Sequence, residues 1–448
     1  MKKARAILCG VLAALMLAGC GGQQGGAAME LKQYAVAQAV YPDYPKRPVE
    51  ADYYRDDGQW DDSAYEADYE KYVDGLQALG KGDERVDTTA LTAFGGNTAA
   101  AIFTTQENTV YSPVSLYVAL GMLTELTDGE TKQQVMDLLG AADAGALRQQ
   151  IKKLWVSVYQ DGDAVCRLAN AAFLRENADV KQSAADTLAQ WYYASSYRVP
   201  MGTEEADRAI ASWLNQQTGG LLAEETGNIR TDAANLLRLY NTIYYKAGWW
   251  EPFKSSRTKA DTFTAADGSE QRADFMHLTE TGDVLRGEGY TAAPKSLKCG
   301  RMVFVLPDEG VTPESLLARD GFLTELTGEY SMADVVWSVP RFDVKTSVDL
   351  KDILKALGVT DAFDGNMADF TPLTDNGAMV NSVMQAARVK IDEEGVEAAA
   401  YTEIVANDSS AMIEPPPVVE MNLNRPFLFV IFDGNDVPLF VGTVQTVA

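Results

Sequence analysis

Residues 391–400 read IDEEGVEAAA, and the chain reaches a proline triplet at 415–417 through a small, polar stretch at 406–412. Glu and Ala are good helix formers, so a helix that begins after Gly395 is one interpretation. Its position argues against a helix, because a strand-like run at 383–391 comes before it and small polar stretches are typical of exposed loops. A long exposed loop inside a compact domain is unusual and tends to be functional. The sequence therefore predicts an exposed, functional loop directly after the strand-like run.

The residues that follow this loop predict a buried hairpin. Two apolar runs, 426–432 and 438–444, are joined by Asp433, Gly434 and Asn435. Turn residues between two apolar strands indicate a hairpin, and the predominantly apolar character of the runs favours burial of both.

Upstream of the loop, helix and strand signals alternate with short connections, and no internal repeat is found. Apolar residues recur at helical spacing in 88–104, 113–124, 132–139, 184–193 and 204–217. Strand-like runs lie at 165–174, 239–245, 302–306, 335–344 and 383–391. One α+β domain over 87–448 is the simplest interpretation.

The N-terminus has the layout of an export signal. Lys2, Lys3 and Arg5 precede an apolar run at 6–18, which is too short for a spanning helix, and the sequence LAG leads directly to Cys20. This arrangement resembles the bacterial lipoprotein box, in which the signal is cut before the cysteine and the thiol is lipidated. We expect residues 1–19 to be the signal peptide and Cys20 to be the lipid anchor, on the extracellular face of the bacterial cell membrane. An ordinary secretory signal, or later release from the cell, stays open as an alternative.

Residues 20–86 are rich in Asp, Glu and Tyr, and we interpret them as a lipid-anchored acidic tether. The aromatic residues leave a second interpretation open, because disordered spacers are usually poor in aromatics. In that interpretation the segment packs on the main domain and 64–79 forms a helix.

Composition excludes several functions. The 448 residues hold 38 Lys and Arg against 64 Asp and Glu, a formal net charge of −26, which argues against nucleic acid as a partner. His277 is the single histidine, so zinc sites that need two imidazoles are excluded, and the four cysteines include no CxxC pair. Nucleophile elbow, phosphate-loop and dinucleotide motifs are absent. A carboxylate pair of the glycosidase kind stays open, but we expect a protein that is not an enzyme and needs no cofactor or metal.

The segment at 391–400 resembles the hinge and reactive loop of the serpins, the serine protease inhibitors whose loop inserts into their own main sheet. Four more blocks are similar to the family and follow its order: YSPVS at 111–115 with GETK at 129–132, NQQTGG at 215–220, NTIYYKAGWWEPF at 241–253 and MNLNRPFLFVI at 421–431. The resemblance implies a serpin fold of the α+β class. That fold has a large mixed central sheet with surrounding helices, a C-terminal hairpin and an exposed reactive loop.

The resemblance assigns the hinge to Glu393, Glu394, Gly395, Val396, Glu397, Ala398, Ala399 and Ala400. Alternate side chains of a strand face opposite ways, so Val396, Ala398 and Ala400 would share one face, while Glu397 would lie on the other. The first face is small or apolar, as a strand that slides over a packed core requires.

Counting from Gly395 as in inhibitory relatives places the reactive bond between Ser409 and Ser410. The next three bonds, as far as Met412–Ile413, stay open as alternatives. All but the last would offer a small side chain to the protease, which implies an elastase-like or subtilisin-like target. The loop from 396 to 414 contains no Lys or Arg, and this argues against trypsin-like proteases.

The resemblance also assigns residues to the shutter, where the sheet parts, and to the breach at its upper opening: Ser112, Ser115, Asn241, Trp249, Arg341 and Gln385. Gln385 stands where many relatives carry His, and an amide can donate and accept hydrogen bonds but cannot take up charge. Arg341 and Glu393 occupy positions that pair in relatives, so we predict an ion pair between them.

The function implied by the resemblance is irreversible suicide inhibition of serine, or of cysteine, proteases by a monomer held at the membrane through lipidated Cys20. The protease would acylate on the reactive bond, and the freed hinge would then insert as a new strand. A non-inhibitory serpin-fold binding protein is one alternative. Another is a surface lipoprotein whose acidic aromatic segment binds a cell-wall or host ligand.

Overall fold

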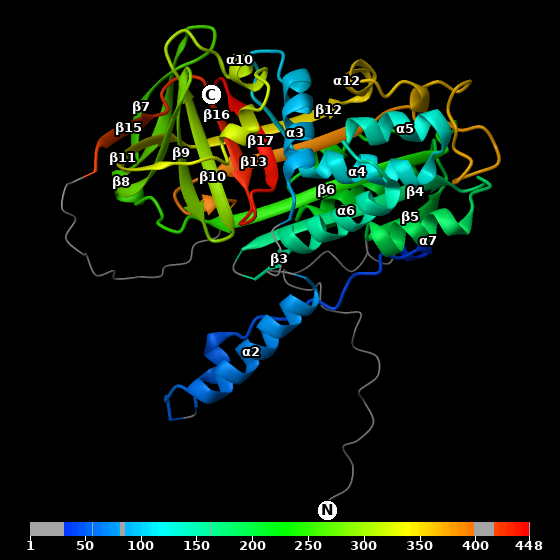
Figure 1. The fold of residues 1–448 in the computed structure, drawn as a ribbon, viewed down its shortest axis with the longest axis horizontal. Coiled ribbons are helices and arrows are strands. Elements are labelled where there is room, and N and C mark those ends of the chain that lie inside the picture. Colours follow the sequence, from blue (N-terminus) through cyan, green and yellow to red (C-terminus); the bar gives the residue numbers. More distant parts are fainter. Residues whose placement is uncertain (1–30, 56, 81–85, 163, 398–415, 448) are drawn as a thin grey trace, which may run out of the picture.

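The computed structural model describes residues 31–55, 57–80, 86–162, 164–397 and 416–447. Two β-sheets share one core, and helices cover them (Figure 1). The predicted reactive bond at Ser409 and Ser410, the hinge residues Ala398, Ala399 and Ala400, and the predicted lipid anchor Cys20 lie outside the described residues.

Sheet 1 carries the hinge and has both parallel and antiparallel pairs. Its strand order is β1 (Ala35–Ala37), β5 (Ala194–Val199), β4 (Val165–Arg175), β6 (Leu237–Gly248), β14 (Gly395–Val396), β13 (Met384–Ile391) and β12 (Phe342–Asp349), with β3 (Gln160–Asp161) beside β4. β4 and β5 run parallel, and the other neighbours are antiparallel. The predicted large mixed sheet is thus confirmed.

Sheet 2 holds the C-terminal hairpin. Its strand order is β15 (Val418–Asn422), β11 (Ser331–Pro340), β8 (Glu270–Gly287), β9 (Tyr290–Leu297), β10 (Gly300–Pro307), β16 (Phe427–Phe432), β17 (Pro438–Val444) and β2 (Thr109–Tyr111), with β7 (Lys259–Thr264) beside β8. Every residue of β16 and β17 is buried, as their predominantly apolar sequences predict.

One predicted strand is wrong. The run 335–344 is divided between β11 in sheet 2 and β12 in sheet 1. β11 ends at Pro340 and β12 begins at Phe342, so the chain changes sheets at Arg341. The Arg341 amide still donates to the Asp274 carbonyl oxygen of β8 at 2.9 Å. The division places Arg341 where the two sheets meet.

The helices that pack on the sheets are α3 (Thr89–Ile102), α4 (Pro113–Leu126), α6 (Ala144–Val158), α7 (Gln182–Trp191) and α8 (Glu204–Gln217), while α5 (Gly129–Leu138) packs on α4. Shorter turns are α9 (Ala223–Thr226), α10 (Pro313–Leu317), α11 (Phe322–Glu325), α12 (Lys351–Ala356), η1 (Glu50–Tyr53), η2 (Ser255–Arg257) and η3 (Asp361–Phe363). α4 contacts both β6 and β17 and is buried almost all round, as its predominantly apolar sequence favours. Ser112 caps α4 by accepting a hydrogen bond from the Ser115 amide at 3.3 Å.

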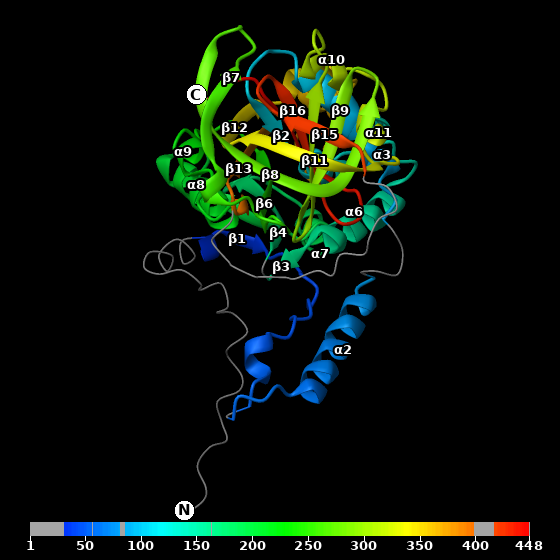
Figure 2. The ribbon, with the colours of Figure 1, turned by 90° about the vertical axis from the view of Figure 1, so that its left-hand side faces the viewer.

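The N-terminal segment is structured where it is described. β1 adds an edge strand to sheet 1, and Leu31 is buried beside it. Tyr41 packs on Trp155, and α2 (Asp62–Ala78) projects away from the body in both views (Figures 1 and 2). Sheet 1 therefore includes residues that the composition had assigned to the tether, and α2 lies where the second interpretation expects a helix. Within the described ranges, no helix combines the length and apolar character needed to cross a membrane.

Candidate functional site: an incomplete sheet and its hinge

The middle of sheet 1 is incomplete. β6 pairs with β4 along residues 237–246, and β13 pairs with β12 along its full length. On their facing edges, the described residues join β6 and β13 only through β14, in which Val396 pairs with Ala247 on one side and Ile391 on the other. In the described part of the chain no ladder pairs the remaining length of these two edges. The two edges can therefore accept a strand, and the hinge already occupies the first positions.

A cavity lies between these edges and α4. Its volume is about 600 Å³, including the part open to solvent, and Leu116, Leu120 and Leu239 contribute to an apolar lining. Two predicted shutter residues, Ser115 and Asn241, also line it. Ser115 Oγ and Asn241 Oδ1 are buried without a hydrogen-bond partner among the described residues. Buried polar atoms normally have hydrogen-bond partners, so the cavity retains unused hydrogen-bonding capacity.

The shutter residues link α4 to sheet 1. Gln385 Nε2 donates to the Ser112 carbonyl oxygen at 3.0 Å, and the Ser112 amide donates to Gln385 Oε1 at 3.1 Å. Asn241 Nδ2 donates to Asn170 Oδ1 on β4. The structure therefore brings Ser112, Ser115, Asn241 and Gln385 together, and Gln385 uses both its donor and its acceptor, as its amide chemistry allows.

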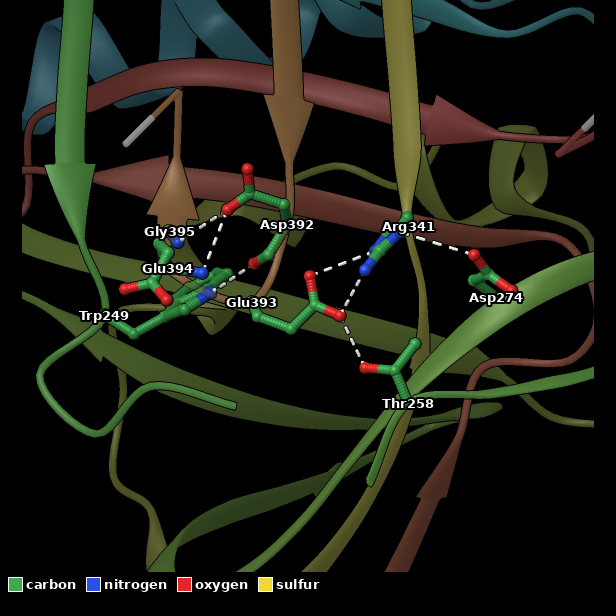
Figure 3. Close-up of polar contacts among 8 residues, drawn as sticks. All are labelled: Trp249, Thr258, Asp274, Arg341, Asp392, Glu393, Glu394 and Gly395. Atoms are coloured by element: carbon green, nitrogen blue, oxygen red, sulfur yellow. Dashed lines mark hydrogen bonds and ion pairs between the residues drawn. The ribbon is translucent and has the colours of Figure 1, made fainter. Parts of the chain in front are cut away.

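Trp249, in the predicted breach, comes just after β6 and lies fully buried beside the turn formed by residues 392–394 (Figure 3). Its amide donates to the Glu394 carbonyl oxygen at 2.8 Å, and its indole Nε1 donates to the Asp392 carbonyl oxygen at 2.9 Å. Asp392 Oδ1 in turn accepts hydrogen bonds from the amides of Glu394 at 2.9 Å and Gly395 at 3.3 Å. These bonds fix the turn from β13 into β14.

The predicted ion pair between Arg341 and Glu393 is confirmed (Figure 3). Arg341 Nε donates to Glu393 Oε2 at 3.0 Å and Arg341 Nη2 donates to Oε1 at 2.5 Å, which makes the pair bidentate. Thr258 Oγ1 also donates to Glu393 Oε1, and Asp274 accepts from Arg341 at 3.3 Å. Burial opposes ionisation of Glu393, but the hydrogen bonds from Arg341 and Thr258 outweigh it, so the pKa of Glu393 is lowered.

The sequence did not indicate Lys295, which lies under Trp249. Its ammonium nitrogen is 5.7 Å from the Trp249 ring centroid and 4.8 Å from that of Phe253, and it pairs with Glu280 at 3.0 Å. The side chain is only 1% exposed, and burial lowers its pKa. Alternation within β9 could have placed Lys295 on the inner face, but an isolated lysine gives no sign that its strand face is buried.

The predicted inward position of Val396 agrees with the structure, in which it is 3% exposed and belongs to the core. Glu397 lies beyond the end of β14 and has a φ of +49°, which is not a strand conformation, so the predicted alternation is not tested there. Gly395 has φ +154°, and a Cβ there would overlap the Ala247 carbonyl oxygen and lie 2.7 Å from the Gly248 Cα. Glycine is thus required for the hinge to lie this close to β6.

Together, the fold and the site define a protein whose central sheet can accept its own hinge as a strand. The family model described as serpin (serine protease inhibitor) matches residues 89–447. Serpin-Z1A from Triticum aestivum is 30% identical over 358 residues, which cover 75% of this chain and 89% of that protein. Serpin B6 from Macaca fascicularis is 28% identical over 344 residues, which cover 72% and 89%. The chain belongs to the serpin family.

Solved structures agree on the fold. The native state of tengpin, a thermophilic serpin, aligns with a TM-score of 0.71 at 23% identity and covers 82% of this chain and 96% of its own. Thyroxine-binding globulin in complex with thyroxine aligns with a TM-score of 0.70 at 23% identity, with coverages of 81% and 99%. The predicted α+β serpin fold is confirmed.

Proposed function

We propose that this chain is an irreversible inhibitor of serine proteases that traps the acyl-enzyme by inserting its reactive loop into sheet 1. One observation carries the proposal: β6 and β13 present facing edges that are unpaired in the described residues, and β14 starts to fill the space between them. The membership of the serpin family supports protease inhibition in general.

The reaction begins as ordinary proteolysis. The catalytic hydroxyl of the protease attacks the carbonyl carbon of Ser409, an ester forms, and Ser410 leaves as a new amino terminus with the proton that the protease base took up. The hinge is then free at one end and continues from Val396 between β6 and β13. The residue before the broken bond carries the bound protease along the sheet, away from the position where water would complete hydrolysis.

The geometry and energetics of insertion are adequate for this movement. About 15 residues at roughly 3.3 Å each span about 50 Å, which is enough to cross a domain. Two new ladders at roughly 1 kcal/mol for each net hydrogen bond give on the order of 10 kcal/mol before the entropy cost. The uncleaved fold is thus metastable relative to the inserted one.

The target and location are part of the same proposal. Small residues around Ser409 favour an elastase-like or subtilisin-like protease, and the lack of Lys and Arg in 396–414 disfavours a trypsin-like one. The lipoprotein-like sequence before Cys20 supports attachment to the outer face of a bacterial membrane. The protein acts as a monomer, because each step uses one copy of the sheet and hinge.

The test is incubation of the purified protein with an elastase-like protease, followed by denaturing electrophoresis. A detergent-stable band containing both proteins is expected, and protease with a blocked active site should give none. Val396→Arg places a charge on the core face of the hinge and should convert the inhibitor into a substrate. The matched control is Val418→Arg, on an exposed side chain of β15 beyond the reactive bond, which should still form the complex. A cleaved loop without any covalent complex in the wild type would favour the serpin-fold binding protein instead.

The acidic aromatic segment needs its own control. α2 has no buried residue, and its pairs, such as Lys71 with Asp68, lie on the surface. Deletion of residues 21–86 would also remove β1 from the edge of sheet 1. Deletion of 50–80 alone therefore tests whether this segment contributes to inhibition, and we expect covalent complex formation to survive it.

A further inference from the structure

Glu397 is the last described residue of the hinge, and it is held in an unfavourable position. Its amide donates to the Lys390 carbonyl oxygen at 3.0 Å, which continues the pairing of β14 with β13. Its φ is +49°, in the left-handed region that residues other than glycine rarely adopt. Its Oε2 is buried without a hydrogen-bond partner among the described residues. Docking this residue therefore costs free energy, through strain and through lost hydration.

Charged and titratable groups from the two neighbouring strands, β6 and β13, and from β12 beyond them act on Glu397. β6 contributes Tyr244 and Lys246, β13 contributes Arg388 and Lys390, and β12 contributes Asp343. Arg388 is engaged elsewhere, because its Nε donates to Asp343 at 2.8 Å and its Nη1 donates to the Leu221 carbonyl oxygen at 3.1 Å. Among the described residues, none of these cations donates a hydrogen bond to Glu397 Oε2 that would replace its lost water.

The balance favours the protonated carboxyl. Burial raises the pKa of Glu397, and the cations at Lys246, Arg388 and Lys390 lower it by less, so that it reaches about 7 from an ordinary 4.5. When the hinge is free, the carboxyl is in water and returns to its ordinary range. Because the docked pKa is the higher one, docking is strongest below about pH 4.5 and weakens as pH rises towards 7.

We propose that Glu397 is a positioning residue that couples the seating of the hinge in sheet 1 to pH: the hinge is seated between β6 and β13 when Glu397 is protonated, and leaves when it is ionised. The consequence for inhibition rests on the proposed function. At neutral pH the released hinge gives the loop its full length for capture by a protease. At acid pH the seated hinge restrains the loop and slows that capture.

Hydrogen exchange measured by mass spectrometry tests the proposal on the full-length protein without any protease. The readout is the protection of peptides that contain the amides of 395–397, corrected for the intrinsic effect of pH, between pH 5 and pH 8. In the wild type, protection should fall on the order of 50-fold across this range. Glu397→Gln carries no titrating group, and its protection should stay constant at the acid level. Glu397→Ala is a second variant without the carboxyl and should also be pH-independent.

Glu394→Gln is the matched control, because it removes a neighbouring carboxylate and leaves Glu397 intact. It should follow the wild type. A wild-type profile that is flat after correction overturns the proposal, and so does a Glu397→Gln profile that falls as the wild type does. The inhibition assay is separate: if the exchange result is as expected but no covalent complex forms, the inhibitor assignment fails and the pH-dependent hinge stands. If complexes form but exchange is pH-independent, the hinge proposal fails alone.

Discussion

At the scale of single residues, the ion pair between Arg341 and Glu393 holds the turn from β13 to β14 against the rest of the breach. The Glu393 side chain is 7% exposed and that of Arg341 is 44% exposed. The buried carboxylate therefore depends on its partner more than the arginine does. Removal of the arginine leaves a buried carboxylate with Thr258 as its remaining side-chain donor among the described residues. Loss of one partner of such a pair costs more than the pair itself contributes.

Arg341→Met should therefore lower the free energy of unfolding by about 1–3 kcal/mol at pH 7, measured by urea denaturation. The folded-state pKa of Glu393 is lowered, so its contribution is present above the unfolded pKa and is lost as pH falls through the folded value. The difference between variant and wild type should accordingly shrink below about pH 4.5.

Arg167→Met is the control, because Arg167 and Asp161 form a pair with side chains 37% and 48% exposed. It should cost less than about 1 kcal/mol, and an equal loss in both variants would contradict the special role of Arg341.

At the scale of the elements, β14 depends on the absence of a side chain at Gly395. Gly395→Ala would place a Cβ against the backbone of Ala247 and Gly248 at a φ of +154°. Strain of this kind costs about 1–3 kcal/mol, so the hinge should leave the sheet. Hydrogen exchange at 395–397, measured at pH 5 where the wild-type hinge is seated, should then be faster by roughly 10-fold or more, while urea unfolding of the body changes little.

Gly434→Ala, in the turn between β16 and β17, is the control for this substitution. A Cβ at that position has no neighbour within 4 Å, so exchange at the hinge should match the wild type. Unchanged protection from hydrogen exchange in Gly395→Ala would show that β14 does not require glycine at position 395.

The elements also show what the sequence could predict. The cap at Ser112, the apolar periods and the hairpin turn are local signals, and α4, β16 and β17 form where those signals predict. β1 has no such signal, because an edge strand is defined by the backbone it pairs with. The core-facing position of Val396 was predictable from period two, but the buried carboxylate oxygen Oε2 of Glu397 was not. It depends on the distance between β6 and β13, which are far apart in sequence.

At the scale of the whole molecule, the incomplete sheet, the unsatisfied shutter atoms and the strained end of the hinge have the same consequence. A strand inserted between β6 and β13 would pair the free edges, could offer partners to the unsatisfied atoms and could release the strain at Glu397. The predicted breach pair was found from the resemblance, but the unsatisfied atoms of Ser115 and Asn241 could be identified only from three-dimensional packing. On the proposed mechanism, the uncleaved fold retains free energy that the completed sheet would release.

This difference predicts the thermal behaviour of the protein. Cleavage near Ser409, with the protease then removed, should raise the melting temperature by roughly 10–20 °C, because about 10 kcal/mol of new pairing is spread over a large domain. Differential scanning calorimetry of the intact and cleaved forms measures the shift. Val396→Arg, cleaved at the same bond, is the control: its hinge carries a charge on the core face, so insertion should stop and the melting temperature should stay near that of the intact protein. If the cleaved wild type melts no higher than the intact one, the unpaired edges of β6 and β13 do not take up the hinge, and trapping by insertion is excluded.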